Sequence, residues 1–178
     1  MPGEFFFMAV GGLGVSLAGF AGLLSTFASS EARSSEVWRW RIKEVVRSGL
    51  MTTFTGFGVV ALFAVTEDAA VTARVISGLV AATLALTHSK MGRPGPAWPN
   101  ERRRRTVWAV GWFVVGLVAT NIVLGSVGLL HVIMLILLWM PASVFVAAVA
   151  DTFSGANPGS GGRPIDHRYP GHQQGDDT

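Results

Sequence analysis

The sequence contains no cysteine and few charged residues, which make up only 14% of its 178 residues. Without cysteine, the chain can form no disulfide bond and offers no thiolate metal ligand or cysteine nucleophile. Charged residues make up about 25% of an ordinary soluble domain, whereas half of this chain is hydrophobic. The charges occur in short blocks separated by long segments that are nearly free of charge, a pattern typical of membrane-spanning helices.

Segments that are apolar and long enough to cross a bilayer recur along residues 1–150. They predict an all-α fold, a polytopic transmembrane helix bundle of about five spans in a single domain. The expected spans cover residues 5–28, 49–66, 69–87, 106–124 and 127–150. Residues 151–178 are rich in Gly, Pro, Asp and His, a composition that predicts a disordered cytoplasmic tail.

Turn signals separate these spans from one another. Residues 106–150 carry no formal charge, and one helix of that length would measure about 68 Å, more than twice the ~30 Å hydrocarbon core. We therefore expect a turn at 125–128, where Gly-Ser-Val-Gly interrupts the apolar run. Asp68, which follows Glu67, is expected to cap the third span. We interpret the first segment as a span rather than a cleaved signal peptide, because only Glu4 and no basic residue precedes it.

The distribution of lysine and arginine predicts the orientation of the bundle. With five spans, 13 of the 14 Lys and Arg residues fall on one side, in the 31–48 and 88–105 segments and in the tail. The positive-inside rule makes that side cytoplasmic and places the N-terminus outside. Most of the tryptophans fall near the same side, as residues of an aromatic belt do. The expected location is the plasma (cell inner) membrane.

Two basic segments are expected at the cytoplasmic face. In the first, Trp38, Ile42 and Val45 recur at helical spacing, which indicates a short interfacial helix or an extension of the second span. The second ends in four consecutive arginines, Arg102, Arg103, Arg104 and Arg105, directly before the fourth span. Such a cluster is able to bind nucleic acid. Its position favours a topogenic signal that contacts anionic lipid, so no nucleic-acid partner is expected.

Small residues in the first span indicate close helix packing. Gly14, Ala18 and Gly22 repeat every four residues, which lets another helix backbone approach closely. This pattern predicts packing within the bundle or homodimerisation, and the four other spans favour packing within the bundle. Pro141, inside the fifth span, removes the helical hydrogen bond to the carbonyl of Leu137 and is expected to kink the helix.

The predicted spans contain few polar side chains that are candidates for a functional site. Arg74, Asn121 and His131 are all expected near the outer ends of their spans, close to Glu67. Brought together, they would form one outer polar cluster able to bind an anion or to take up a proton. The alternative, which we favour, is a set of independent interface residues in contact with headgroup water.

The sequence offers no recognisable catalytic or cofactor motif. His88 and His131 are expected at opposite ends of the bundle, which argues against shared haem ligation, and no metal or other cofactor is expected. No H-E-x-x-H or Walker A sequence occurs. The leading hypothesis is therefore a multi-pass, non-enzymatic subunit or accessory factor that acts through helix–helix contacts with a membrane protein or with a second copy. The alternatives are a small transporter, channel or sensor that uses the outer polar cluster, and a membrane enzyme.

Overall fold

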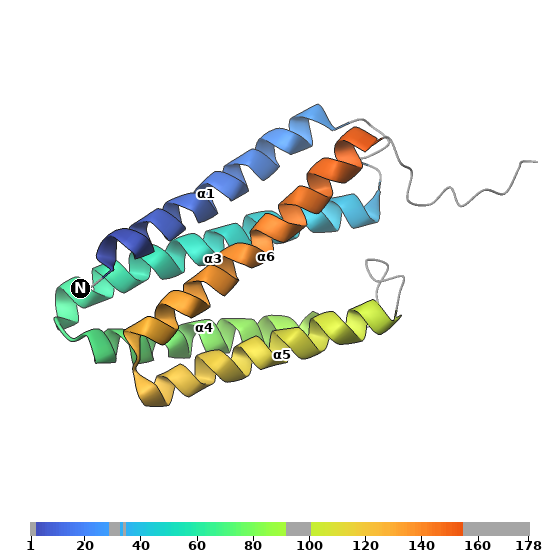
Figure 1. Cartoon of the computed structure of the whole chain (residues 1–178). Helices are drawn as coiled ribbons and strands as arrows, with labels where there is room; N and C mark the ends of the chain where they lie inside the picture. The colour runs from blue at the N-terminus through green and yellow to red at the C-terminus, as the bar shows by residue number, and fades with distance from the viewer. Residues whose placement is uncertain (1–2, 29–32, 34, 92–100, 155–178) are drawn as a thin grey trace, which may run out of the picture.

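A computed structural model describes residues 3–28, 33, 35–91 and 101–154. Within these residues the chain forms long helices and no strand (Figure 1). The helices are, in order, α1 (Glu4–Phe27), α3 (Glu36–Thr66), α4 (Ala69–Met91), α5 (Glu101–Leu124) and α6 (Val127–Ser154). The all-α helix bundle that the sequence predicts is therefore confirmed. Residues 155–178, most of the expected tail, lie outside the described residues.

Among the described residues, four helices are long and apolar enough to cross a membrane: α1, α3, α4 and α6. In α5 the apolar stretch, Trp108–Leu124, is shorter. Glu101 and the arginines that follow it occupy the first turns of this helix, before that stretch. At 1.5 Å per residue, the apolar stretch measures about 25 Å, close to the ~30 Å thickness of a hydrocarbon core.

The helix ends follow from local capping interactions. α3 begins after Ser35, whose hydroxyl oxygen accepts a hydrogen bond from the amide of Trp38 at 3.4 Å, and continues without a break to Thr66. The basic 36–48 segment is therefore an extension of the second span rather than a separate helix. Asp68 caps α4 as expected, because its carboxylate accepts hydrogen bonds from two amides of the first turn at 2.8 and 3.0 Å.

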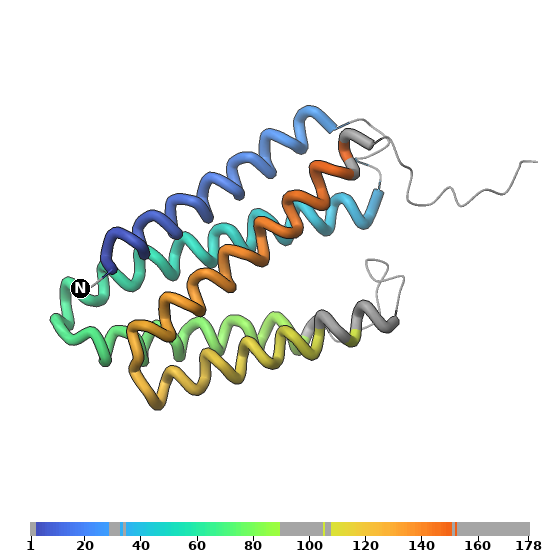
Figure 2. Tube along the Cα trace, in the orientation of Figure 1, coloured from blue at the N-terminus to red at the C-terminus, as the bar shows by residue number. Residues whose placement is uncertain are grey.

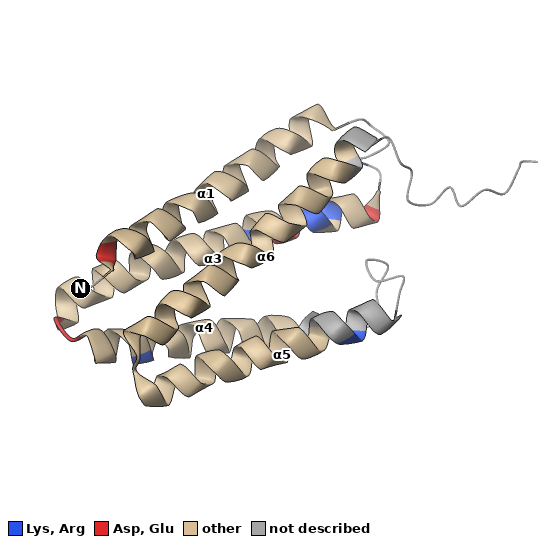
Figure 3. Ribbon diagram, in the orientation of Figure 1, with Lys and Arg blue, Asp and Glu red and all other residues tan. Residues whose placement is uncertain are grey.

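The helices form two groups. α1, α3 and α6 pack on one another, and α4 and α5 form a hairpin. The groups meet at the end that carries the α3–α4 and α5–α6 turns, which we call the turn end, and Figure 2 shows them separating toward the opposite end. The opposite end carries the described Lys and Arg residues of α3 and α5, whereas Arg74 lies at the turn end (Figure 3). We call it the basic end.

The fully buried side chains lie mainly toward the turn end, where all five helices contribute. They include Phe7 of α1, Val59 of α3, Val118 of α5, and Leu130 and Ile133 of α6. These residues belong to one apolar cluster that connects the three-helix group to the hairpin. The turn end is therefore where the relative positions of the two groups are fixed, and it is also where the polar candidate residues lie.

Glycines bring α1 and α3 into backbone contact. A Cβ atom built on Gly14 would lie 2.6 Å from the carbonyl oxygen of Gly49, and one built on Gly56 would lie 2.5 Å from that of Phe7. Both distances are too short for a real side chain, so only glycine permits this approach. The sequence analysis did not single out Gly49 or Gly56.

Candidate functional site

Asn121 is fully buried and ties the α5–α6 turn to α4. Its side-chain amide donates to the hydroxyl of Ser77 at 2.9 Å, and its side-chain carbonyl accepts from the amide of Ser126 at 2.9 Å. Its backbone carbonyl accepts from the amide of Gly125 at 2.8 Å, and Gly125 adopts a positive φ of 61° that favours glycine. The side-chain carbonyl therefore serves the turn itself, and the side-chain amide joins this turn to α4.

Arg74 lies beside the same turn. A Cβ atom built on Gly125 would come within 2.9 Å of the Nε atom of Arg74. The arginine side chain is exposed overall, although it crosses close to the turn glycine. The structure therefore brings Arg74 and Asn121 to one turn, through contacts among α4, α5 and α6.

His131 lies instead against the start of α1. Its ring centroid is 4.6 Å from those of Phe6 and Phe7, and a Cβ atom on Gly3 would overlap its Nε2 atom. Its Nδ1 atom is 2.7 Å from the carbonyl oxygen of Val127, and because a carbonyl only accepts, Nδ1 donates this hydrogen bond. The half-buried imidazole thus anchors the N-terminus of α1 to α6.

Glu67 lies in the α3–α4 turn, where its side chain is exposed. Its backbone adopts a left-handed φ of 55°, and its amide donates to the carbonyl of Phe63 at 2.8 Å, which ends α3. All four predicted cluster residues are thus at the turn end, but they occupy separate places. Arg74 and Asn121 share the α5–α6 turn, His131 contacts α1, and Glu67 ends α3.

The three small residues of the first span do not share one environment. Gly14 touches α3, and a Cβ atom on Gly49 would lie 3.4 Å from the Cβ atom of Ala18. A Cβ atom on Gly22, in contrast, would have no neighbour within 4 Å. Gly14 and Ala18 therefore pack within the bundle, whereas the space beside Gly22 is open.

Pro141 is fully buried within α6, which continues on both sides of it. The ring nitrogen of proline has no hydrogen to donate to the carbonyl of Leu137. The hydroxyl of Thr52 on α3 lies 3.0 Å from that carbonyl oxygen and 2.9 Å from the carbonyl oxygen of Ser48 on its own helix, so the two carbonyls share its hydrogen. A threonine on a neighbouring helix therefore supplies the hydrogen bond that the proline removes, a known way to satisfy freed backbone groups inside a membrane.

Thr53 makes the corresponding link to the other side of α3. Its hydroxyl lies 3.0 Å from the carbonyl oxygen of Gly11 on α1 and 2.9 Å from that of Gly49 on its own helix. Two adjacent threonines thus connect α3 to both α6 and α1. Sequence reasoning missed them, although three threonines within residues 52–55 of an apolar span were a visible signal of buried polar contacts.

His88 is buried at the basic end of α4, against α5. Its Nδ1 atom is 3.0 Å from the carbonyl oxygen of Leu84, and a Cβ atom on Gly111 would overlap its ring. His88 and His131 therefore lie at opposite ends of the bundle, as the spans implied. Of the four consecutive arginines at the start of α5, Arg105 is exposed, and the side chains of 102–104 lie outside the described residues.

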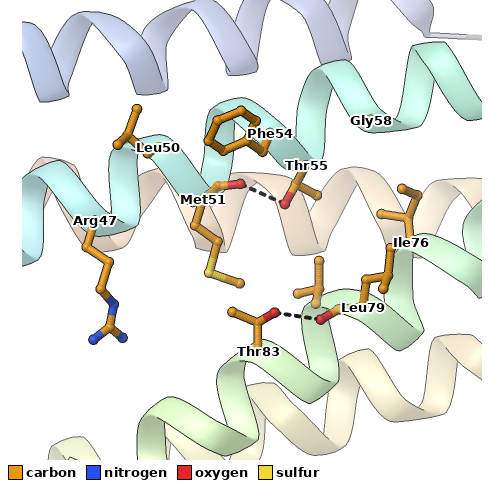
Figure 4. A pocket seen from close by; sticks show the side chains of 10 residues that line it. Arg47, Leu50, Met51, Phe54, Thr55, Gly58, Ile76, Leu79 and Thr83 are labelled. Carbon is orange, nitrogen blue, oxygen red and sulfur yellow. Dashed lines mark hydrogen bonds between the residues drawn. The ribbon is translucent and has the colours of Figure 1, made fainter.

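A groove of about 460 Å³ lies between α3 and α4 (Figure 4). Its walls are apolar except for two threonines and for Arg47, which extends from α3 at one end of the groove. The residues that line it are Arg47, Leu50, Met51, Phe54, Thr55, Gly58, Ile76, Leu79, Val80 and Thr83. Sequence reasoning did not predict this groove.

Together, the helices and the buried contacts define a multi-helix apolar bundle of the kind found in membrane proteins. No protein-family model, curated protein or solved structure matches the chain. The polar groups at the turn end bond mainly to other groups of the same chain, and these bonds position the turns and the helix ends.

Proposed function

We propose that the chain is a non-enzymatic subunit or accessory factor of a membrane complex and that it acts through helix–helix contacts. The observation that carries this proposal is a set of α1 glycines that the bundle itself does not use. Cβ atoms built on Gly12, Gly19 and Gly22 would have no neighbour within 4 Å. The side of α1 that carries these glycines therefore does not pack on α3.

These glycines lower the stability of the α1 helix, and contacts within the bundle do not offset this loss. Glycine within a helix is less favourable than alanine by roughly 0.5–1 kcal/mol. At Gly11 and Gly14, backbone contacts to α3 offset this loss of stability. Gly12 and Gly19 have no such contact. Between them, the hydroxyl of Ser16 donates to the carbonyl of Gly12 at 2.9 Å. Small residues of this kind allow a second helix to approach closely in a lipid environment.

The proposed setting is the plasma membrane, with the basic end in the cytoplasm. Arg39, Arg41, Lys43, Arg47 and Arg105 all lie at the basic end of the described residues. The acidic turn residues, Glu67 and Asp68, lie at the other end. This asymmetry supports an orientation with the N-terminus outside, because positive residues are retained on the cytoplasmic side.

The test introduces leucine at Gly12 and Gly19 together, with Gly116→Leu on α5 as the matched control, since a Cβ atom there also has open space. Tagged chain is expressed at its native level, solubilised in mild detergent and sized. The wild-type chain and Gly116→Leu are expected in a larger complex, and the double variant as a monomer. Recovery of the wild-type chain only as an isolated monomer would contradict the proposal.

A further inference from the structure

We propose that the groove between α3 and α4 binds an anionic phospholipid, with one acyl chain lying along the groove and the phosphate at Arg47. This site is separate from the α1 glycines, which lie on another helix. It does not depend on the proposed assembly function.

One face of α3 changes from cationic to apolar at the mouth of the groove. Residues separated by four positions, or by seven and eleven, share a face of a helix. The cations on this face are exposed. Arg39 and Lys43 precede the groove, and Arg47 lies at its mouth. The same face then continues into the groove with apolar residues and a glycine: Leu50, Met51, Phe54 and Gly58. In a phospholipid, too, a charged headgroup is followed by apolar hydrocarbon chains.

The length of the groove matches one leaflet of a bilayer. From Arg47 to Gly58 the helix rises about 16 Å at 1.5 Å per residue, and half of a ~30 Å hydrocarbon core is about 15 Å. The groove therefore reaches from the depth of the headgroups at the basic end to near the bilayer midplane. A single acyl chain of the adjacent leaflet has the length and the chemistry to fill it.

The walls of the groove suit hydrocarbon rather than a polar ligand. The hydroxyl of Thr55 donates to the carbonyl of Met51 at 2.8 Å, and that of Thr83 donates to the carbonyl of Leu79 at 2.9 Å. Figure 4 shows both hydrogen bonds directed along their own helices. Their hydrogen atoms are thus already used within the protein, and the remaining lining is almost entirely apolar. A cavity lined in this way does not hold water well.

The charge at the mouth of the groove favours an anionic headgroup over a zwitterionic one. Arg47 is about half exposed, and its guanidinium lies 3.8 Å from the carboxylate of Glu44, a mostly buried neighbour one turn away. Glu44 partly offsets this one cation. Glu36 is also exposed on this face, but Arg39, Lys43 and Arg47 together outnumber Glu36 and Glu44. The remaining local excess of positive charge attracts anionic lipid at the membrane surface.

The test measures lipid retention by the purified full-length chain in mild detergent, using native mass spectrometry. Dioleoyl phosphatidylglycerol and dioleoyl phosphatidylcholine are added in equal amounts, because they share acyl chains and differ in headgroup charge. The wild-type chain is expected to retain phosphatidylglycerol preferentially. Arg47→Gln should reduce this preference by about fivefold, the equivalent of ~1 kcal/mol for one cation near a membrane. Arg33→Gln, which removes an exposed arginine before α3 at the same end and outside the groove, should preserve it.

Two variants test the groove itself. Leucine at Gly58, or at Thr83 on the opposite wall, would fill the space and is expected to lower retention of both lipids. Gly116→Leu, on a surface with open space, should retain both, and circular dichroism identifies variants that fail to fold. Equal retention of the two lipids by the wild-type chain would overturn the proposal, as would unchanged retention in both groove variants. A lipid-free dimer that the groove variants dissociate would show that a second copy occupies the groove.

Discussion

α3 meets α1 on one side and α4 on another, and the two interfaces differ in the size of the residues they use. Toward α1, Gly49 and Gly56 let the backbones touch. Toward α4, the larger residues Leu50, Met51 and Phe54 line a groove. The same helix therefore forms one closed and one open interface.

The difference teaches how a bundle is held together when lipid surrounds it. Hydrocarbon tails are as apolar as leucine, so burying large apolar side chains gives little net gain. Backbone proximity and buried hydrogen bonds remain as the main sources of association. The closed interface has both, since Thr53 reaches the carbonyl of Gly11. The part of the α3–α4 interface that lines the groove has neither, because the hydroxyls of Thr55 and Thr83 bond to their own helices.

The largest contrast is expected between the same substitution at the two interfaces. Gly14→Ala places a methyl group against the backbone of Gly49 and should lower the free energy of unfolding by about 3 kcal/mol, because neither backbone can move away easily. Gly58→Ala meets only the Cδ1 atom of Ile76, at 3.6 Å. It should raise stability by up to ~1 kcal/mol through helix propensity. Unfolding in mixed micelles, followed by circular dichroism, measures both changes.

Gly22→Ala serves as the control within α1, because a methyl group there has open space. It should behave like Gly58→Ala and unlike Gly14→Ala. Equal losses of stability at residues 14 and 22 would show that the closed interface does not depend on the Gly14–Gly49 contact.

A smaller effect is expected from the threonine that compensates for Pro141. Thr52→Val keeps the shape of the side chain but leaves the carbonyl of Leu137 without its donor, which should cost about 1–2 kcal/mol. In a Pro141→Ala background, the backbone amide of residue 141 is able to donate to that carbonyl, so the same change should cost about 1 kcal/mol less. A double-mutant cycle measures this coupling. Additive costs would mean that Thr52 does not substitute for the missing amide.

The helix order and the turns were predictable from the sequence because hydrocarbon imposes strong local rules. Charge-free segments of sufficient length must be helical in a bilayer, and Asp68 and Gly125 mark turns through well-defined backbone preferences. The extension of α3 and the continuation of α6 to Ser154 were less predictable. They depend on contacts between the two helices at the basic end, where the indole of Trp38 donates to the hydroxyl of Thr152 at 3.1 Å.

The candidate sites were less predictable because they depend on which helices are neighbours and which faces meet. Residues four apart advance by about 40° around a helix. Gly14 and Gly22 are therefore about 80° apart, and only Gly14 faces α3. Similarly, the sequence predicts His131 and Asn121 at a similar depth in the membrane, but the two residues have different neighbours. Asn121 bonds to α4 through Ser77, whereas His131 packs on α1.

The smallest expected effects separate two phenylalanines that lie one turn apart on α3. Phe54 is 73% exposed and lines the groove, whereas Phe57 is 44% exposed and lies beside Gly11 of α1. Phe54→Ala should change the free energy of unfolding by less than about 0.5 kcal/mol, because the lost contacts are mainly with lipid. Phe57→Ala should cost about 1 kcal/mol, because it also removes contacts to α1. The reverse order in mixed-micelle unfolding would show that side chains of α3 hold α4 in place and that the α3–α4 interface is closed rather than open.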